Sequence, residues 1–150
     1  MDHLHVRRLA AGDRTLARTT FAAMAEVFEE PHAPLSDGYL DRLLLRDDFW
    51  ALAALAGDEV VGGLTAHTLP MTRAETSEIF IYDIAVRAEH QRRGVGRQLM
   101  LALRDAAAAR GIDELFVPAD DADAHALDFY RALGGTASPV TFFTFGSAGR

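Results

Sequence analysis

Two hydrophobic periods alternate along the chain. Between residues 14 and 28, apolar side chains recur every three or four positions, as on one face of a helix, whereas residues 79–86 form an apolar run of β-compatible residues. Strands are predicted at His3–Ala10, Phe49–Ala56, Glu59–Leu69, Ile79–Val86, Asp113–Pro118 and Val140–Phe145. Helices are predicted from Asp13 to Phe28, from Ser36 or Asp37 to Leu44, from Gly94 to Arg110, and from within Ala119–Asp123 to Leu133.

The order of these elements constrains the architecture. Gly57 and Asp58 can form a tight hairpin turn, so the second, third and fourth strands are expected to form an antiparallel meander. A helical crossover begins only at Gly94. The order β, α, α, β, β, β, α, β, α, β therefore predicts an α/β (α+β) fold with a mixed sheet.

Length and composition favour one soluble domain. A chain of 150 residues can bury about 70% of the surface that its unfolded form exposes, so residues 1–150 are expected to form a single domain. No apolar run approaches 18 residues, and the N-terminus lacks the apolar core of a signal peptide, which predicts a cytoplasmic protein without a membrane anchor. The absence of cysteine excludes disulfides, thiolate metal sites and a cysteine nucleophile.

The formal net charge of −7 bears on the partners. A domain of this size that binds nucleic acid normally presents a basic face, so nucleic acid is not expected and cationic partners are favoured. A mildly acidic total that only maintains solubility is the alternative. His3 and His5 share a strand face at a spacing that could hold a metal, but no third ligand accompanies them, and no metal site is predicted.

The clearest chemical signal lies at residues 91–96, where a strand gives way to a helix. The segment reads Gln-Arg-Arg-Gly-Val-Gly: the glycines let backbone N–H groups converge, the helix start adds partial positive charge, and the arginines add full charges. These features indicate a pyrophosphate site. A Walker loop would need Lys-Ser or Lys-Thr where Arg97-Gln98 stands, and a dinucleotide loop would need glycine at Leu99. A plain tight turn is the remaining alternative.

This loop, placed after an apolar strand, fits the pattern Q/R-x-x-G-x-G/A and resembles the acetyl-CoA motif of the GNAT superfamily of N-acetyltransferases. The resemblance implies a GNAT fold, with a mostly antiparallel sheet of six to seven strands and about four helices. It also implies acetyl-CoA as the cosubstrate. The implied coenzyme contacts are Ile84, Ala85, Val86, Gln91, Arg92, Arg93, Gly94, Val95, Gly96 and Arg97.

A second block, Ala126–Gly135, resembles the last-helix signature of the same superfamily. In that signature, a tyrosine at the position of Tyr130 lies near the coenzyme sulfur. A buried aromatic whose hydroxyl simply finds a partner is the alternative. The signature often carries asparagine where this chain has Asp123, and a carboxylate cannot donate as an amide does, so Asp123 could cap the helix instead.

Acetyl transfer from a thioester to an ammonium group requires a base, donors for an oxyanion, and an acid for the leaving thiolate. The resemblance implies a splay between the fourth and fifth strands, which would free backbone groups of Ile84–Val86 for the pantetheine arm and the thioester carbonyl. Tyr130 would act as general acid. Asp83 can act as general base or, alternatively, only as a ligand for a second amine. Tyr82 is a further candidate substrate contact, although strand alternation points it to the opposite face.

From Phe49 to Phe145, the chain further resembles aminoglycoside 3-N-acetyltransferases of the GNAT type, through Glu78–Val86, Glu89-His90 and the acidic Ala119–Asp123. Aminoglycosides are polycations that carboxylates can bind. The candidate ammonium contacts are Asp83, Asp120, Asp121, Glu29 and Glu30. Asp120 and Asp121 could instead only cap the last helix, and Glu29 and Glu30 could simply lie at the solvent-exposed end of the first helix.

The activity implied by this resemblance is direct transfer of an acetyl group from acetyl-CoA to the 3-amino group of a gentamicin-type aminoglycoside, which would confer resistance. Another amine acceptor, such as a polyamine, a small metabolite or a protein N-terminus, is the main alternative. A non-catalytic acetyl-CoA-binding module is a further one. Many relatives form dimers, so a homodimer is also considered.

Overall fold

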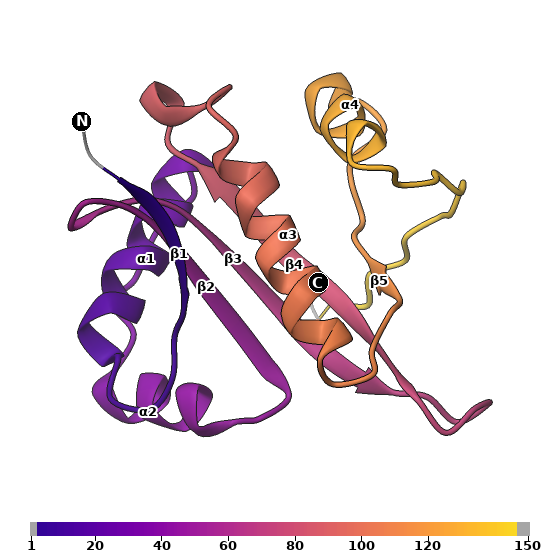
Figure 1. The fold of residues 1–150 in the computed structure, drawn as a ribbon, viewed down its shortest axis with the longest axis horizontal. Helices are drawn as coiled ribbons and strands as arrows, with labels where there is room; N and C mark the ends of the chain where they lie inside the picture. Colours follow the sequence, from indigo (N-terminus) through magenta and orange to yellow (C-terminus); the bar gives the residue numbers. More distant parts are fainter. Residues whose placement is uncertain (1–2, 147–150) are drawn as a thin grey trace. The chain divides into compact units, whose positions relative to one another are not determined.

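The computed structural model describes residues 3–146. The chain divides into two compact units, Met1–Pro118 and Ala119–Arg150 (Figure 1).

The first unit is built on a five-stranded sheet whose strands follow one another in chain order. The first four strands pair antiparallel, and the last pairs parallel to its neighbour because helix α3 crosses over between them. The strands are β1 (Leu4–Arg8), β2 (Phe49–Ala56), β3 (Glu59–Pro70), β4 (Ser77–Val86) and β5 (Leu115–Phe116). The helices are α1 (Arg14–Val27), α2 (Asp37–Leu45), the short 3₁₀ turn η1 (Ala88–His90) and α3 (Val95–Ala108).

Helices cover both faces of this sheet (Figure 1). Successive residues of a strand point to opposite faces, and Gly62 and Gly63 of β3 show which helix lies on each. A Cβ at Gly62 would meet Val95 of α3, whereas one at Gly63 would meet Thr20 and Met24 of α1. Strand β2 is buried on both faces from Phe49 to Leu55, as its continuous apolar run predicts.

Local sequence sets the helix starts. The Ser36 hydroxyl accepts a hydrogen bond from the Tyr39 N–H at 3.1 Å, which caps α2. Asp13 occupies the cap position of α1 as predicted, but its carboxylate accepts from the Ala10 N–H at 2.8 Å rather than from the helix. Gly94 begins α3 at φ 82°, a left-handed conformation that glycine adopts without steric cost.

The close approach of α1 to β3 depends on Gly63. An alanine Cβ there would lie 2.7 Å from both Met24 Sδ and Thr20 Cγ2, and both side chains are buried. Gly63→Ala is therefore expected to lower the free energy of unfolding by about 1 to 3 kcal/mol, measured by urea denaturation. The matched control is Gly38→Ala in α2. Its Cβ would meet only the flexible end of Arg42, so it is expected to be neutral or up to about 1 kcal/mol stabilising.

The second unit contains helix α4 (Ala124–Ala132). Asp123 caps it, because its Oδ1 accepts a hydrogen bond from the Ala126 N–H at 3.1 Å. The helix ends before Gly134, which has a φ of 93°, and the Gly135 N–H then donates to the Tyr130 carbonyl. The cap at Asp123 agrees with the alternative raised by its sequence.

The prediction of six to seven strands is wrong for the part of the chain that the structure describes, which has five. The predicted strand at Val140–Phe145 is not formed, and the fifth strand spans two residues rather than six. Alternating apolar residues favour a strand only if another strand offers its backbone as a partner. Among residues 3–146, no strand pairs with Val140–Phe145, and its large side chains are at least 75% exposed.

No helix among the described residues is long and apolar enough to cross a bilayer.

Candidate active site

A cavity of about 320 Å³ lies between the α1–α2 side of the first unit and strands β2 to β4. Its walls are largely rings, and two carboxylates lie among them. The ring-bearing lining residues are Phe21, Phe28, His32, Tyr39, Phe49, His67 and Tyr82, and the carboxylates are Glu30 and Asp83. The arrangement suits an amine on an organic scaffold, since it offers acceptors for an ammonium group beside apolar surface.

A β-bulge determines which side chains of β4 reach this cavity. Thr65 of β3 pairs with Asp83, but the next residue, Ala66, pairs with Ile81, so Tyr82 is the extra residue. The bulge interrupts the strict alternation of the strand, and Tyr82 and Asp83 both line the cavity. The prediction that Tyr82 points to the opposite face is therefore wrong.

Asp83 is half-buried in this wall. Burial raises the pKa of its carboxyl above the ordinary value, and the negative charge of Glu30 raises that pKa further. A carboxylate with a raised pKa is a stronger proton acceptor than an exposed aspartate. Asp83 therefore has the position and the chemistry to accept a proton from an amine in the cavity.

Glu29 and Glu30, at the start of the loop between α1 and α2, differ in their position relative to the cavity. Glu30 lines the cavity, whereas Glu29 is not one of its lining residues. Glu29 has a φ of 55°, a left-handed conformation uncommon for glutamate, at the point where the chain leaves the helix. Of the two predicted amine contacts in this loop, the structure brings only Glu30 to the same cavity as Asp83.

His67 is a wall residue that sequence reasoning missed. Its ring centroid lies 5.4 Å from that of Phe49 and 6.0 Å from that of Tyr82. Thr65 and His67 are two positions apart on β3 and both line the cavity. This spacing was a usable signal, because residues i and i+2 of a strand share a face.

Strands β4 and β5 separate soon after they meet. Their pairing covers only Ile79 and Phe80, so among residues 3–146 no strand pairs with β4 on that side from Ile81 to Val86. The Arg87 N–H donates to the Val61 carbonyl on the β3 side. By alternation, Ala85 also directs its backbone groups toward β3, whereas Ile84 and Val86 direct theirs toward the open side.

The segment that follows β4 forms a turn rich in N–H groups. Arg92 has a φ of 62° and Gly94 one of 82°, and the Gln91 side chain ties the turn to the strand by donating to the Val86 carbonyl at 3.0 Å. The Gln98 N–H is the first to bond back into α3, to the Gly94 carbonyl. The N–H groups of the preceding helical residues, Val95, Gly96 and Arg97, therefore have no partner within the helix.

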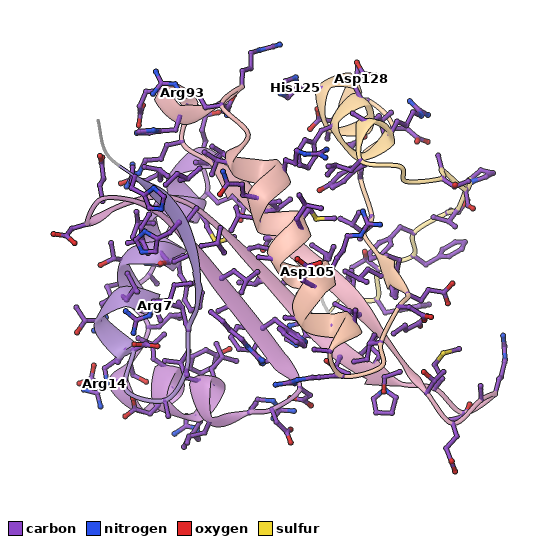
Figure 2. All side chains as sticks on the ribbon, in the orientation of Figure 1. Arg7, Arg14, Arg93, Asp105, His125 and Asp128 are labelled. Carbon is purple, nitrogen blue, oxygen red and sulfur yellow. The ribbon has the colours of Figure 1, made fainter. Side chains whose placement is uncertain are left out.

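Three arginines surround this turn. Arg92, Arg93 and Arg97 are all exposed, and Figure 2 labels Arg93 on the segment before α3. Free N–H groups at a helix start and nearby guanidinium groups together favour an anion such as a pyrophosphate.

The second unit carries the remaining predicted site residues. Tyr130 is half-buried on α4, and its ring makes an edge contact with Phe129 at 5.2 Å between centroids. Asp120 Oδ1 accepts a hydrogen bond from the Ala122 N–H at 2.9 Å, which stabilises the turn before the helix, and Asp121 is exposed. Because Asp123 is the cap of α4, the alternative that Asp120 and Asp121 cap it is wrong.

Among residues 3–146, no group of three or more histidine, aspartate or glutamate side chains is arranged to hold a metal ion.

One family model and several known proteins match this chain. The model of the acetyltransferase (GNAT) family matches residues 15–134. A curated relative, the uncharacterized N-acetyltransferase YvbK of Bacillus subtilis, is 31% identical over 105 residues, which cover 70% of this chain and 61% of that protein. The match thus spans about three-fifths of the relative's length.

Two solved structures are more similar over their whole length. Aminoglycoside acetyltransferase meta-AAC0020 from an uncultured soil metagenomic sample, in complex with sisomicin, is 32% identical with a TM-score of 0.89, covering 96% of this chain and 95% of that one. Aminoglycoside acetyltransferase HMB0005, also from an uncultured soil metagenomic sample, is 36% identical with a TM-score of 0.91, covering 97% and 99%.

The chain belongs to the acetyltransferase (GNAT) family. By class it is an N-acetyltransferase, which confirms the resemblance seen in its two sequence blocks.

Proposed function

We propose that this protein transfers an acetyl group from acetyl-CoA directly to a primary amine of an aminoglycoside, the 3-amino group of a gentamicin-type drug, and thereby confers resistance. The observation that carries the proposal is the cavity in which Asp83 and Glu30 lie together among aromatic rings. The similarity to aminoglycoside acetyltransferases, one of them in complex with sisomicin, supports the choice of acceptor.

Enzymes of this family use acetyl-CoA, and the turn at Gln91–Arg97 has the chemistry to hold its pyrophosphate. Backbone N–H groups at the start of α3 would bind the phosphate oxygens, and the arginines of the turn would neutralise their charge. The open backbone edge at Ile84 and Val86 would receive the pantetheine arm, and an N–H group there would stabilise the oxyanion at the thioester carbon. Ala85 supports this edge through its pairing with β3.

Gly94→Ala tests the phosphate turn. The substitution is expected to lower the affinity for acetyl-CoA by tenfold or more in calorimetry, because a left-handed φ is strained for alanine and the turn must shift. Gly111→Ala is the matched control. It introduces a similar strain at φ 76° just beyond the other end of α3, again with nothing within 4 Å of the new Cβ. Equal affinities of the two variants would contradict the assignment.

The chemical step needs a proton acceptor and a proton donor. Asp83 would accept the proton that the ammonium group must lose before it can attack, directly or through water. The amine nitrogen then attacks the thioester carbon, a C–N bond forms, and the C–S bond breaks. Tyr130 would supply a proton to the departing thiolate and would regain one, through water, as the nitrogen loses its second proton to give the amide. Direct transfer needs no nucleophile from the protein, which agrees with the absence of cysteine.

An amine panel tests the acceptor. With gentamicin, sisomicin, spermidine and a short peptide, release of free thiol is expected to be fastest for the aminoglycosides, and NMR of the product should place the acetyl group on the 3-amino nitrogen. Expression in a susceptible bacterium should raise the inhibitory concentration of gentamicin. Thiol release with spermidine or the peptide alone would instead assign another acceptor.

Substitutions of Glu30 and Glu29 test whether the cavity binds the acceptor amine. Glu30→Gln is expected to raise KM for the drug by about tenfold. A tenfold rise in KM corresponds to the weakest charge-assisted hydrogen bonds, and a weak one is expected because Glu30 is exposed. Glu29→Gln, outside the cavity lining, should leave KM unchanged. Asp120→Asn and Asp121→Asn should also raise KM for the drug more than for acetyl-CoA if these carboxylates bind ammonium groups.

A further inference from the structure

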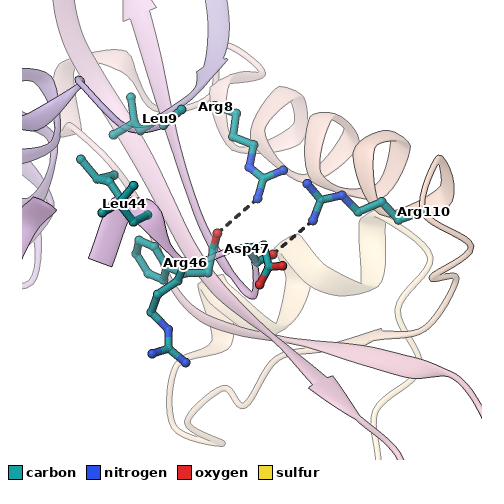
Figure 3. A pocket seen from close by; sticks show the side chains of 9 residues that line it. Arg8, Leu9, Leu44, Arg46, Asp47 and Arg110 are labelled. Atoms are coloured by element: carbon teal, nitrogen blue, oxygen red, sulfur yellow. Dashed lines mark hydrogen bonds between the residues drawn. The ribbon is translucent and has the colours of Figure 1, made fainter. Parts of the chain in front are cut away.

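A second cavity, of about 310 Å³, lies in the first unit where the end of β1, the segment between α2 and β2, and the end of α3 meet (Figure 3). Leu9, Leu44 and Phe49 provide apolar walls, and Arg8 and Arg110 reach it from opposite sides. Arg110 lies beyond the C-terminal end of α3, about 20 Å along that helix from the phosphate turn. The two sites are therefore separate.

The arginine pair, Arg8 and Arg110, converges on one aromatic ring. The guanidinium carbon of Arg8 lies 3.8 Å from the centroid of Trp50, and that of Arg110 lies 4.7 Å from it. Trp50 is fully buried, and its Nε1–H donates to Thr68 Oγ1 at 2.8 Å, which fixes the orientation of the ring. Both cations are thus held on a rigid platform.

Each member of the pair is held by one backbone carbonyl. Arg8 donates to the Phe49 carbonyl and Arg110 to the Asp47 carbonyl, both at 3.2 Å, as the dashed lines of Figure 3 show. A guanidinium group has five N–H donors, so most donors of each arginine remain for another partner. Within residues 3–146, neither arginine forms an ion pair with a carboxylate, in contrast to Arg7 and Arg46.

The two charges also act on each other. Burial lowers the pKa of Arg8, and the positive charge of Arg110 lowers that pKa further. Asp47 adds an exposed carboxylate to the lining, while Arg46 is already engaged by both oxygens of Asp48 at 2.9 Å. An anion between the paired arginines would offset their mutual repulsion.

A simpler account is that both arginines only cover Trp50, with Arg110 also favoured near the C-terminal end of a helix. That account explains the position of either arginine alone. It does not explain why two like charges share one ring beside an open cavity with apolar walls.

We propose that this cavity binds a small organic carboxylate, with its oxygens between the guanidinium groups of the arginine pair and its apolar body against the leucine walls. Planar guanidinium groups match the geometry of a carboxylate, and the apolar walls favour an organic body over a bare inorganic ion. The site shares the Phe49 wall with the amine cavity but neither of that cavity's carboxylates, Glu30 and Asp83.

Fluorescence of Trp50 can report binding, because Trp50 is the only tryptophan of the chain and its ring contacts both arginines. Benzoate, titrated into the full-length protein at constant ionic strength, is expected to change Trp50 fluorescence saturably and to raise Tm. Benzamide, its neutral analogue, should do neither. No saturable change with benzoate, or an equal change with benzamide or inorganic phosphate, would overturn the proposal.

Substitutions of Arg8 and Arg110 test whether these two arginines bind the benzoate. Arg110→Gln, at an exposed position, is expected to weaken the apparent affinity for benzoate at least tenfold, and Arg8→Lys should weaken it by loss of the planar fork. Arg7→Gln is the matched control: Arg7, labelled in Figure 2, neighbours Arg8 on β1 but forms an ion pair with Asp13. If Arg110→Gln and Arg7→Gln respond to benzoate as the wild type does, the arginine pair is not the site.

Discussion

Replacing Asp83 with asparagine is expected to lower kcat/KM for acetyl transfer by about 10²- to 10⁴-fold, the range that general-base catalysis contributes. The side chain keeps its size and its place in the cavity wall, so the loss would reflect the missing proton acceptor. The measurement is thiol release at saturating acetyl-CoA with the acceptor varied.

The same substitution should not cost stability at neutral pH. Burial raises the pKa of Asp83, so folding favours its protonated form. The stability associated with that proton is present below the unfolded pKa of about 3.9 and is lost as the pH rises through the raised folded value. Asp83→Asn should therefore be at least as stable as the wild type at pH 7. A large loss of stability there would make Asp83 a structural residue.

The pH profile separates a base from a ligand. Wild-type activity should fall as the pH falls through the raised pKa of Asp83, and this acid limb should be absent in Asp83→Asn. Glu30→Gln should move the limb to lower pH, because the negative charge of Glu30 contributes to the raised pKa. An unchanged limb in Asp83→Asn would make Asp83 a ligand for a second amine only.

Replacing Tyr130 with phenylalanine is expected to lower turnover by about 10²-fold or more, with nearly unchanged affinity for acetyl-CoA. Phenylalanine keeps the ring that contacts Phe129 on α4, so the packing of the helix should persist. The substitution removes the phenol hydroxyl, the proposed proton donor. Pre-steady-state release of thiol and calorimetry with acetyl-CoA measure the two effects separately.

The leaving group provides the control for Tyr130. A thioester whose thiol has a lower pKa needs less protonation as it departs, so the defect of Tyr130→Phe should shrink with such a donor. Tyr82→Phe removes a hydroxyl from the cavity wall and should keep the dependence on the leaving group of the wild type. If Tyr130→Phe lowers turnover equally with acetyl-CoA and with the thioester of the more acidic thiol, Tyr130 is not the general acid.

Sequence alone determined the features that depend on neighbouring residues. The run Phe49–Ala56 is a strand with the bounds that its composition predicts, because eight apolar residues between polar turns satisfy both faces of a central strand. Ser36 caps α2, and Gly94 begins α3 with a positive φ, since a short hydroxyl side chain and a missing Cβ act locally. The family followed from the same local pattern around residues 91–96.

The tertiary structure decided whatever depends on two distant segments. The bulge that brings Tyr82 beside Asp83 exists only in the pairing of β4 with β3, and alternation within one strand predicts the opposite. The ring of His67 contacts those of Phe49 and Tyr82 because β3 lies between β2 and β4 in the sheet. Arg8 and Arg110, far apart in the chain, meet on Trp50 because β1 and the end of α3 pack at the same place. Pairing register and side-chain packing are properties of two surfaces, and the sequence of either one does not contain them.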